Sequence, residues 1–262
     1  YRPLGGESGQ AFADAFTARV EQAIAELEEA GHGVACFILC PYFANEGFPD
    51  LPAGFLDKAV KAIRAAGGIV IADEVQPGFG RTGTHMWGHE KIGVEPEIVT
   101  TGKPMANGHP VGCVVSSPEI LSAFHTATGY FNTFGGNPVS CAAAVATLNV
   151  LETENLMANA EDAGNYARGR MAALAQRYEA IGDIRGSGLF FGAELVKNRA
   201  TKEPYAELAE KVSNAMRQEG VLLNRASIHN NTLKVRPPMP FGRAEADFLV
   251  DTLDSVLGKL TG

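Results

Sequence analysis

The chain has 262 residues, of which 45% are hydrophobic and 20% are charged, so it can bury a sizeable core in one large or two smaller domains. Its net charge of -8 argues against nucleic acid or an anionic membrane as the main partner. No apolar run approaches the ~20 residues that span a bilayer, and the first residues lack a charged-then-apolar signal pattern, so we expect a cytoplasmic protein.

The first part of the chain alternates helical and strand patterns, the rhythm of a β-α-β protein. Apolar residues at helical spacing, proline near helix starts and glycine after helix ends predict the helices, and short β-branched runs predict the strands. The expected helices are 9–30, 55–66, 118–126 and 138–152, and the expected strands are 34–39, 68–73, 98–101 and 112–116. The sequence therefore predicts an α/β domain with a mostly parallel sheet and helices on both faces.

The remainder differs in character. After a break, we expect a helix at 156–178, glycine-spaced strands within 181–195, a helix at 205–219, strands near 221 and at 233–235, and a closing helix at 244–260. That order indicates a smaller α+β unit. We therefore divide the chain into residues 1–153, as part of a large domain, and residues 154–262, as a small C-terminal domain.

An acid and an amine follow two of the predicted strands. Asp73 closes a wholly apolar segment of the kind that forms a buried parallel strand, and ligands in open α/β sheets bind outside the carboxyl ends of such strands. Lys103 follows the next strand, after a Thr-Gly pair, where a lone lysine is usually a solvated loop residue. A lysine amine can form a Schiff base with a carbonyl cofactor, and a carboxylate keeps a pyridine nitrogen protonated. The two residues together suit a pyridoxal phosphate site.

The stretch 71–112 resembles the signature region of the class III pyridoxal-phosphate aminotransferases, the ornithine and 4-aminobutyrate aminotransferase group. The matching runs are ADEVQ at 72–76, GFGRTG at 78–83, PEIVT at 96–100, GK at 102–103 and GHPVG at 108–112. The resemblance implies the type I fold of pyridoxal-phosphate enzymes and the transfer of an amino group from an amine or amino acid to a keto acid. It covers only the later part of the family sequence, since fuller members carry an earlier portion with a phosphate loop and a ring-stacking aromatic residue.

The resemblance also assigns roles in cofactor binding. It implies that Asp73 pairs with the pyridinium nitrogen, that Val75 packs on one face of the ring, and that Gln76 lies near the phenolic oxygen. It implies that Lys103 forms the Schiff base, and that Thr133 reaches the cofactor phosphate of the neighbouring subunit in a homodimer. If Asp73 is the last buried residue of its strand, alternation places Val75 on the same side as Asp73.

One position departs from the transaminases of this family, which usually carry an arginine where this chain has Lys234, to clamp the substrate carboxylate. A lysine lacks the planar, two-pronged grip of a guanidinium. Arg236 lies two residues on, and strand alternation would put it on the same face, so a shifted carboxylate contact is an open alternative. The lysine form, together with the runs 108–111 and 131–141, resembles the subgroup of alanine–glyoxylate aminotransferase 2-like proteins and ethanolamine-phosphate phospho-lyases. The lyases of this subgroup eliminate phosphate from amino-alcohol phosphates such as phosphoethanolamine.

The sequence disfavours a scaffold, a dinucleotide site and a metal site. A non-catalytic scaffold or fragment of this fold would have no chemical reason to keep Asp73 and Lys103. The run 78–83 satisfies the dinucleotide pattern G-x-G-x-x-G, but residues 84–89 lack the amphipathic helix that the motif needs. No Cys-x-x-Cys pair or Cys/His cluster suggests a metal, and the four cysteines are expected to be reduced core residues; they are Cys36, Cys40, Cys113 and Cys141.

Overall fold

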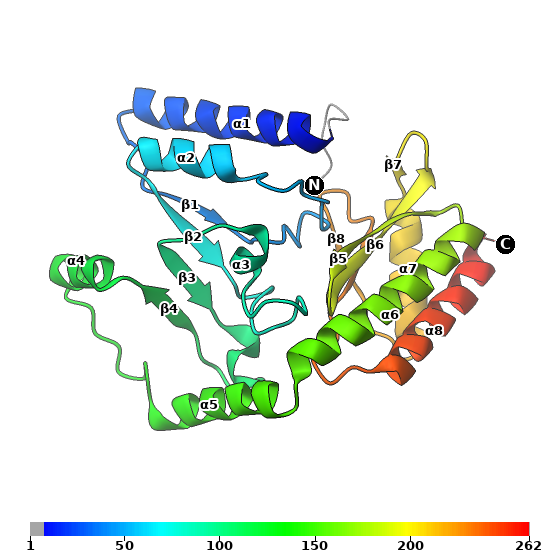
Figure 1. The fold of residues 1–262 in the computed structure, drawn as a ribbon. Helices are drawn as coiled ribbons and strands as arrows, with labels where there is room; N and C mark the ends of the chain where they lie inside the picture. Colours follow the sequence, from blue (N-terminus) through cyan, green and yellow to red (C-terminus); the bar gives the residue numbers. More distant parts are fainter. Residues whose placement is uncertain (1–7, 262) are drawn as a thin grey trace.

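The computed structural model describes residues 8–261 and contains two sheets that lie side by side (Figure 1). The first sheet has the order β1-β2-β3-β4, and its strands are Cys36–Leu39, Ile69–Asp73, Ile98–Thr101 and Cys113–Ser116. The pairs β1–β2 and β2–β3 are parallel, whereas β4 is antiparallel to β3. The prediction of a mostly parallel sheet is therefore confirmed, with one antiparallel strand at its edge.

Helices α1 (Gly9–Glu29) and α2 (Asp57–Ala65) pack on each other, and α2 packs on β1 and β2. They bury an apolar cluster that includes Phe12, Leu39, Phe55, Val60 and Val70. Apolar residues at helical spacing meet apolar residues of the strands in this cluster, so the periodicity seen in the sequence is the periodicity of the core.

Two later helices of the first half begin where their capping residues predict. The side chain of Ser117 accepts a hydrogen bond from Ile120 N at the start of α4 (Pro118–Thr128). Asn137 accepts one from Ser140 N at the start of α5 (Pro138–Thr153). Each cap is followed by proline, which suits the first turn of a helix.

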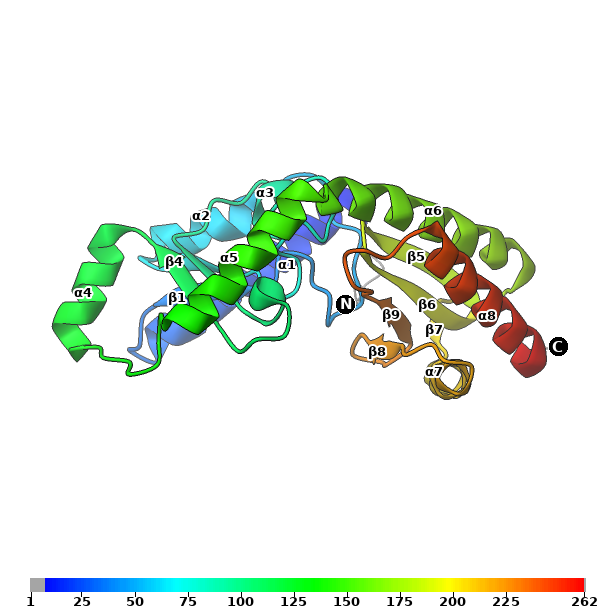
Figure 2. The same cartoon turned by 90° about the horizontal axis from the view of Figure 1, so that it is seen from below.

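Helix α5 runs beneath the first sheet and leads, after a short break, into α6 (Leu156–Arg177), as Figure 2 shows. The break coincides with Asn155, whose backbone is left-handed with φ +51°. Asparagine tolerates this conformation better than most residues, and the turn redirects the chain to the second sheet.

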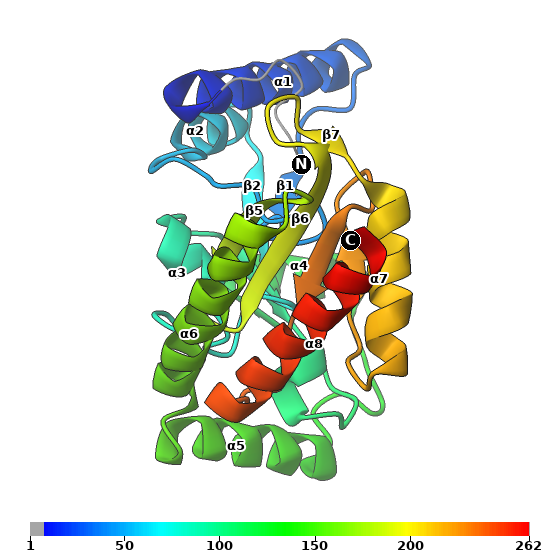
Figure 3. The same cartoon turned by 90° about the vertical axis from the view of Figure 1, so that its right-hand side faces the viewer.

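The second sheet has the order β5-β6-β9-β8 and is antiparallel throughout. Its strands are Ile181–Ser187, Phe190–Asn198, Thr232–Val235 and Asn224–Ala226, in that order, and the two-residue strand β7 (Glu203–Pro204) pairs with β6. Helices α6, α7 (Ala206–Gln218) and α8 (Arg243–Thr261) cover the face turned away from the first sheet (Figure 3). The core between them includes Met171, Phe191, Leu195, Leu233 and Leu253.

The strand expected near residue 221 is wrong by a few positions, since β8 begins at Asn224. Gly220 ends α7 with φ +88°, Val221 N bonds back to Met216 O, and Leu223 O accepts from Ser213 Oγ. These hydrogen bonds hold the apolar residues 221–223 against α7, so that they do not pair with β9. The sequence pattern could not separate a helix cap from a strand.

Helix α3 (Gly88–Ile92) was not predicted. Its first amides at Gly88 and His89 donate to the distant carboxylate of Glu74, and Trp87 N donates to Glu90. A long-range acceptor therefore creates this helix, which is too short to be the amphipathic helix of a dinucleotide motif.

The expected core placement of the cysteines is also wrong. All four thiols are free, Cys36 and Cys141 are exposed, and Cys40 and Cys113 are half-buried. Cys36 lies on β1, where Ile38 is also exposed, and Cys113 lies on β4, where Val114 and Val115 are exposed. An apolar strand pattern does not reveal which of its faces is covered.

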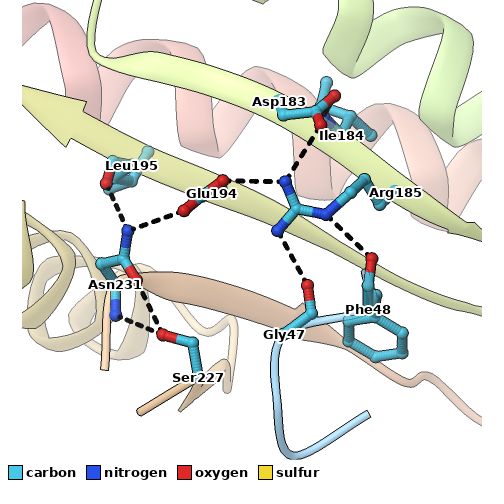
Figure 4. A network of polar contacts seen from close by, with 9 residues as sticks. All are labelled: Gly47, Phe48, Asp183, Ile184, Arg185, Glu194, Leu195, Ser227 and Asn231. Atoms are coloured by element: carbon cyan, nitrogen blue, oxygen red, sulfur yellow. Dashed lines mark hydrogen bonds and ion pairs between the residues drawn. The ribbon is translucent and has the colours of Figure 1, made fainter. Parts of the chain in front are cut away.

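A polar network fixes the loop after β1 against the second sheet (Figure 4). Arg185 of β5 donates to Gly47 O and Phe48 O, both at 2.8 Å, and forms an ion pair with Glu194 at 2.8 Å. In the same network, Asn231 donates to Glu194 at 3.2 Å. The network joins the two sheets and positions the residues between Cys40 and Phe48.

Candidate active site

The site lies at the sheet edge where the parallel strands end. Asp73 is the last residue of β2 and is opposite Thr100 of β3, and Lys103 follows β3 as the first residue of the short 3-10 helix η1 (Lys103–Ala106). The arrows of β2 and β3 point toward the second sheet in Figure 1. The structure therefore brings Asp73 and Lys103 to one edge of the sheet, as the order of strands predicted.

Asp73 is half-buried and its Oδ1 accepts a hydrogen bond from Val75 N at 3.0 Å. Asp73 thus ends β2 without full burial, whereas the next residue, Glu74, is fully buried. Val75 is half-buried like Asp73, and a Cβ placed on Gly102 would lie 3.9 Å from Val75 Cγ2. Val75 thus lies between the Asp73 strand and the residue before Lys103.

Glu74 has no exposed surface and accepts three hydrogen bonds. The donors are Gly88 N at 2.8 Å, His89 N at 2.7 Å and the His89 ring Nδ1 at 2.8 Å. A buried carboxylate is stable only when it is paired in this way. Glu74 therefore anchors the loop after Asp73 to the segment around Gly88 and His89, a role that the sequence pattern did not reveal.

Lys103 is exposed, and within residues 8–261 its ammonium group makes no hydrogen bond or ion pair. Its backbone φ is +38°, a value that a non-glycine residue adopts at a cost. Such strained residues cluster at functional sites, where the surrounding structure holds them. The amine is open to a carbonyl compound in the adjoining cavity.

A cavity of about 880 Å³ separates the sheet edge from the second sheet. Its polar end is lined by Asn45, Gln76, Lys103, Lys234 and Arg236, which come from both sheets and the loops between them. The lining also includes Glu245, Phe248 and Leu249 of α8. Its size and its few convergent polar groups are those of a small-molecule site.

Gln76 connects the two sides of this cavity. Its Oε1 accepts from Lys234 Nζ at 2.6 Å and from Arg236 Nη1 at 3.3 Å. Asn45 Oδ1 accepts from Gln76 Nε2 at 3.3 Å and from Lys234 Nζ at 3.2 Å. Lys234 and Arg236 therefore reach the same oxygen, in agreement with their expected common face. Asn45 was missed by the sequence, although its position just after β1 placed it at the carboxyl edge.

Lys234 carries a charge in an unusual setting. Its Nζ lies 6.0 Å from the Phe48 ring centre and 5.7 Å from that of Phe190, and it forms no ion pair with any acid of the described chain. Burial, followed by the neighbouring charge of Arg236, lowers the pKa of Lys234 to about 8. This pKa includes a smaller lowering effect of Lys103 and opposing effects of Cys40 and Glu46. Three cationic side chains thus face one cavity, which suits the binding of an oxyanion.

Thr133 does not join these residues. It is exposed in the loop between α4 and α5, and the residues that line the cavity within 8–261 do not include it. In the same part of the chain, no cluster of His, Cys, Asp and Glu could hold a metal ion. The helices of the described residues are all too short or too polar to cross a membrane.

Comparison with known proteins assigns a family to this arrangement. The model of the class-III aminotransferase family matches residues 3–257. An alanine–glyoxylate aminotransferase 2-like protein from Drosophila melanogaster is 48% identical over 219 residues, which are 83% of this chain and 44% of the fly protein. The mitochondrial alanine–glyoxylate aminotransferase 2 homolog 2 from Arabidopsis thaliana is 39% identical over 260 residues, 99% of this chain and 53% of that protein.

Among solved structures, a phospholyase from Arthrobacter in complex with phosphoethanolamine is similar with a TM-score of 0.90 and 47% identity. The match covers 94% of this chain and 58% of the phospholyase. The chain thus spans about half the length of the curated relatives it matches. With an acid and a lysine at the ends of neighbouring strands, and a family model that matches nearly its whole length, this chain belongs to the class-III aminotransferase family.

Proposed function

We propose that the whole protein is a pyridoxal-phosphate-dependent enzyme that transfers an amino group from a small amine or amino acid to a keto acid. The observation that carries this proposal is the placement of Asp73 and Lys103 at one sheet edge, beside a cavity with an oxyanion-binding end. Membership of the family implies the cofactor. A non-catalytic scaffold would not need a strained, unpartnered lysine at the mouth of the cavity.

The side chains present fit pyridoxal phosphate. The carboxylate of Asp73 would hold a proton on the ring nitrogen, Val75 would pack on the ring, and the amide of Gln76 would reach the phenolic oxygen. The free amine of Lys103 would bind the carbonyl carbon. When bound, the cofactor acts as an electron sink for the carbon beside the substrate nitrogen. Lys103 would then take and return the proton of that carbon.

Lys234 and Arg236 would hold the second polar group of the substrate. Within residues 8–261, Lys234 donates to the neutral acceptors Gln76 and Asn45, and Arg236 donates to Gln76, so an incoming oxyanion would replace these contacts by hydrogen bonds between charged groups. This contact would orient the substrate so that its amine meets Lys103. Substrate recognition at this end would not need a metal, because the positive charge comes from the chain itself.

A second candidate function is the elimination of phosphate from an amino-alcohol phosphate such as phosphoethanolamine. One observation favours it: Lys234 stands where a transaminase of this family carries the arginine that clamps a carboxylate. A compact ammonium group and a nearby guanidinium suit a phosphate dianion better than the planar carboxylate. The similarity to the Arthrobacter phospholyase supports this candidate as well.

We propose a homodimer in which Thr133 reaches the neighbour's cofactor phosphate. The loop around Thr133 and the elements beside it expose many large apolar side chains, which a second copy could cover. They are Val114, Val115, Leu121, Phe124, Tyr130, Phe131, Phe134 and Val139. Gel filtration of the full-length protein tests this proposal, and a monomer that still binds cofactor contradicts it.

Two organisational points are proposals of the same kind. We propose residues 1–153 as part of the large domain and 154–262 as the small domain, supported by the turn at Asn155 and by separate apolar cores, although residues 1–7 and 262 lie outside the described range. A cytoplasmic location is proposed from the sequence, whereas one relative named above is mitochondrial. Fractionation of the source cells distinguishes the two compartments.

The experiment compares two substrates on the full-length protein with pyridoxal phosphate. Loss of alanine that depends on a keto acid supports amino transfer, and phosphate release from phosphoethanolamine supports elimination. Lys103→Ala is the control, since both reactions need its amine. If the protein binds the cofactor at Lys103 but performs neither reaction, both substrate assignments are refuted. If the protein stays colourless with the cofactor, the proposal of a pyridoxal-phosphate-dependent enzyme is refuted.

A further inference from the structure

Arg81 is a buried cation that the proposed chemistry does not use. It lies in the loop after β2 with 8% of its surface exposed, and it forms no ion pair with any acid of residues 8–261. Its guanidinium donates through Nη1 to Pro237 O at 2.6 Å and to Leu189 O at 3.3 Å. Its own carbonyl accepts from Leu189 N at 3.0 Å. Arg81 therefore links the loop of the first sheet to two connections of the second sheet.

The burial of this charge without a carboxylate is costly. Desolvation, followed by the charge of Arg236, lowers the pKa of Arg81 to about 10. Two carbonyl acceptors satisfy only part of the five donors of a guanidinium. A neutral side chain would fill this space at a lower cost in desolvation, so the bonds to Pro237 and Leu189 must serve a purpose that the charge is needed to achieve.

The position of Pro237 indicates that purpose. Pro237 directly follows Arg236, the residue at which the chain leaves β9. Gln76, from the same loop as Arg81, accepts a hydrogen bond from the side chain of Arg236, while Arg81 holds the backbone just after it. The loop after β2 thus contacts the guanidinium of Arg236 through Gln76 and the backbone that follows Arg236 through Arg81.

Close packing prevents this loop from sliding along the second sheet. Gly188, in the turn before Leu189, has φ +51°, and a Cβ there would lie 2.5 Å from Arg81 O. A Cβ on Gly83 would lie 2.9 Å from Glu161 Cα of α6. At this point the backbone of the loop packs directly against the backbone of the turn at Gly188 and of α6. The hydrogen bonds of Arg81 therefore join segments that have little room to move.

We infer that Arg81 is a positioning residue for the oxyanion end of the cavity: through Pro237 it holds Arg236 where a substrate phosphate or carboxylate binds. The inference rests on the proposed function, in which Arg236 contacts the substrate. Arg81 itself touches neither substrate nor cofactor. Without the hydrogen bonds of Arg81, the Arg236 side chain explores other positions, which weakens anion binding and leaves the reactivity of the Lys103 amine unchanged.

Inorganic phosphate is the probe, used as a competitive inhibitor of the full-length enzyme loaded with cofactor. Arg81→Met is expected to raise the inhibition constant of phosphate roughly tenfold, as for the loss of a hydrogen bond that fixes a charged group. Labelling of Lys103 by borohydride reduction should be unchanged. Arg199→Met is the matched control, because Arg199 also donates to backbone carbonyls, those of Ile181 and Tyr178, and does not line the cavity.

A double-mutant cycle with Arg236→Met decides the outcome. If Arg81 acts through Arg236, Arg81→Met adds nothing in the Arg236→Met background, whereas independent effects that multiply overturn the inference. An unchanged constant in Arg81→Met, with a raised one in Arg236→Met, also overturns it. An unchanged constant in Arg236→Met alone refutes the substrate contact of the proposed function instead. If Arg81→Met does not fold, Arg81→Lys is measured in the same way, because it keeps the charge but lacks the planar set of guanidinium donors.

Discussion

Replacement of Lys234 by methionine separates the contribution of this residue to anion binding from its effect on the stability of the fold. The ammonium group donates to two neutral acceptors, Gln76 at 2.6 Å and Asn45 at 3.2 Å, and its Nζ lies 6.0 Å and 5.7 Å from the centres of two phenylalanine rings. Methionine removes the buried charge, and its sulfur can pack on the rings for about 0.3–1.5 kcal/mol. The two lost hydrogen bonds cost about 0.5–1.5 kcal/mol each. We therefore expect the free energy of unfolding to change by no more than about 1–2 kcal/mol.

Anion binding should respond much more strongly. A hydrogen bond between charged groups contributes about 1.5–3 kcal/mol, so the loss of Lys234 should weaken the binding of inorganic phosphate about 10- to 150-fold. Denaturant unfolding and phosphate inhibition of the full-length protein measure the two quantities. Lys197→Met is the control, because Lys197 is an exposed lysine paired with Glu203 and should change neither. A Lys234→Met protein that is much less stable but binds phosphate normally refutes the reasoning.

Three further predictions concern single residues. Lys103→Ala should lower turnover by at least ~100-fold while the circular dichroism spectrum stays unchanged, because the side chain is exposed; a variant with normal turnover contradicts its role as base. Lys234 loses its proton as the pH rises through about 8, so phosphate binding should weaken above that pH in the wild type, and equally strong dependence in Lys234→Met would reject Lys234 as the titrating group. Glu74→Gln should lower the free energy of unfolding by about 1.5–3 kcal/mol in a denaturant titration, since its amide cannot accept from Gly88 and His89 as the carboxylate does, and unchanged stability would count against the anchor.

Local signals in the sequence predicted much of the first sheet and the positions of both members of the proposed catalytic pair. Asp73 and Lys103 each follow a short β-branched run, and parallel strands bring their carboxyl ends together. The starts of α4 and α5 were readable because a capping side chain and a proline stand at each. These features depend on residues a few positions apart, so sequence patterns contain them.

The remaining parts of the site depend on partners far away in the chain. Asn45 enters the cavity because Ser227 N donates to its carbonyl and because Arg185 holds the residues after it. Glu74 becomes a buried anchor only through the amides of α3, and Arg81 through the carbonyl of Pro237. No local pattern encodes such contacts, since each acceptor or donor is an ordinary backbone group.

The central claim, that Lys103 is the amine that binds the cofactor, has one direct test. The full-length protein is incubated with pyridoxal phosphate and reduced with borohydride, and the modified peptide is then mapped by mass spectrometry. We expect a stable cofactor adduct on Lys103, in the peptide that follows β3. An adduct on Lys234 instead, or no adduct on any lysine, contradicts it.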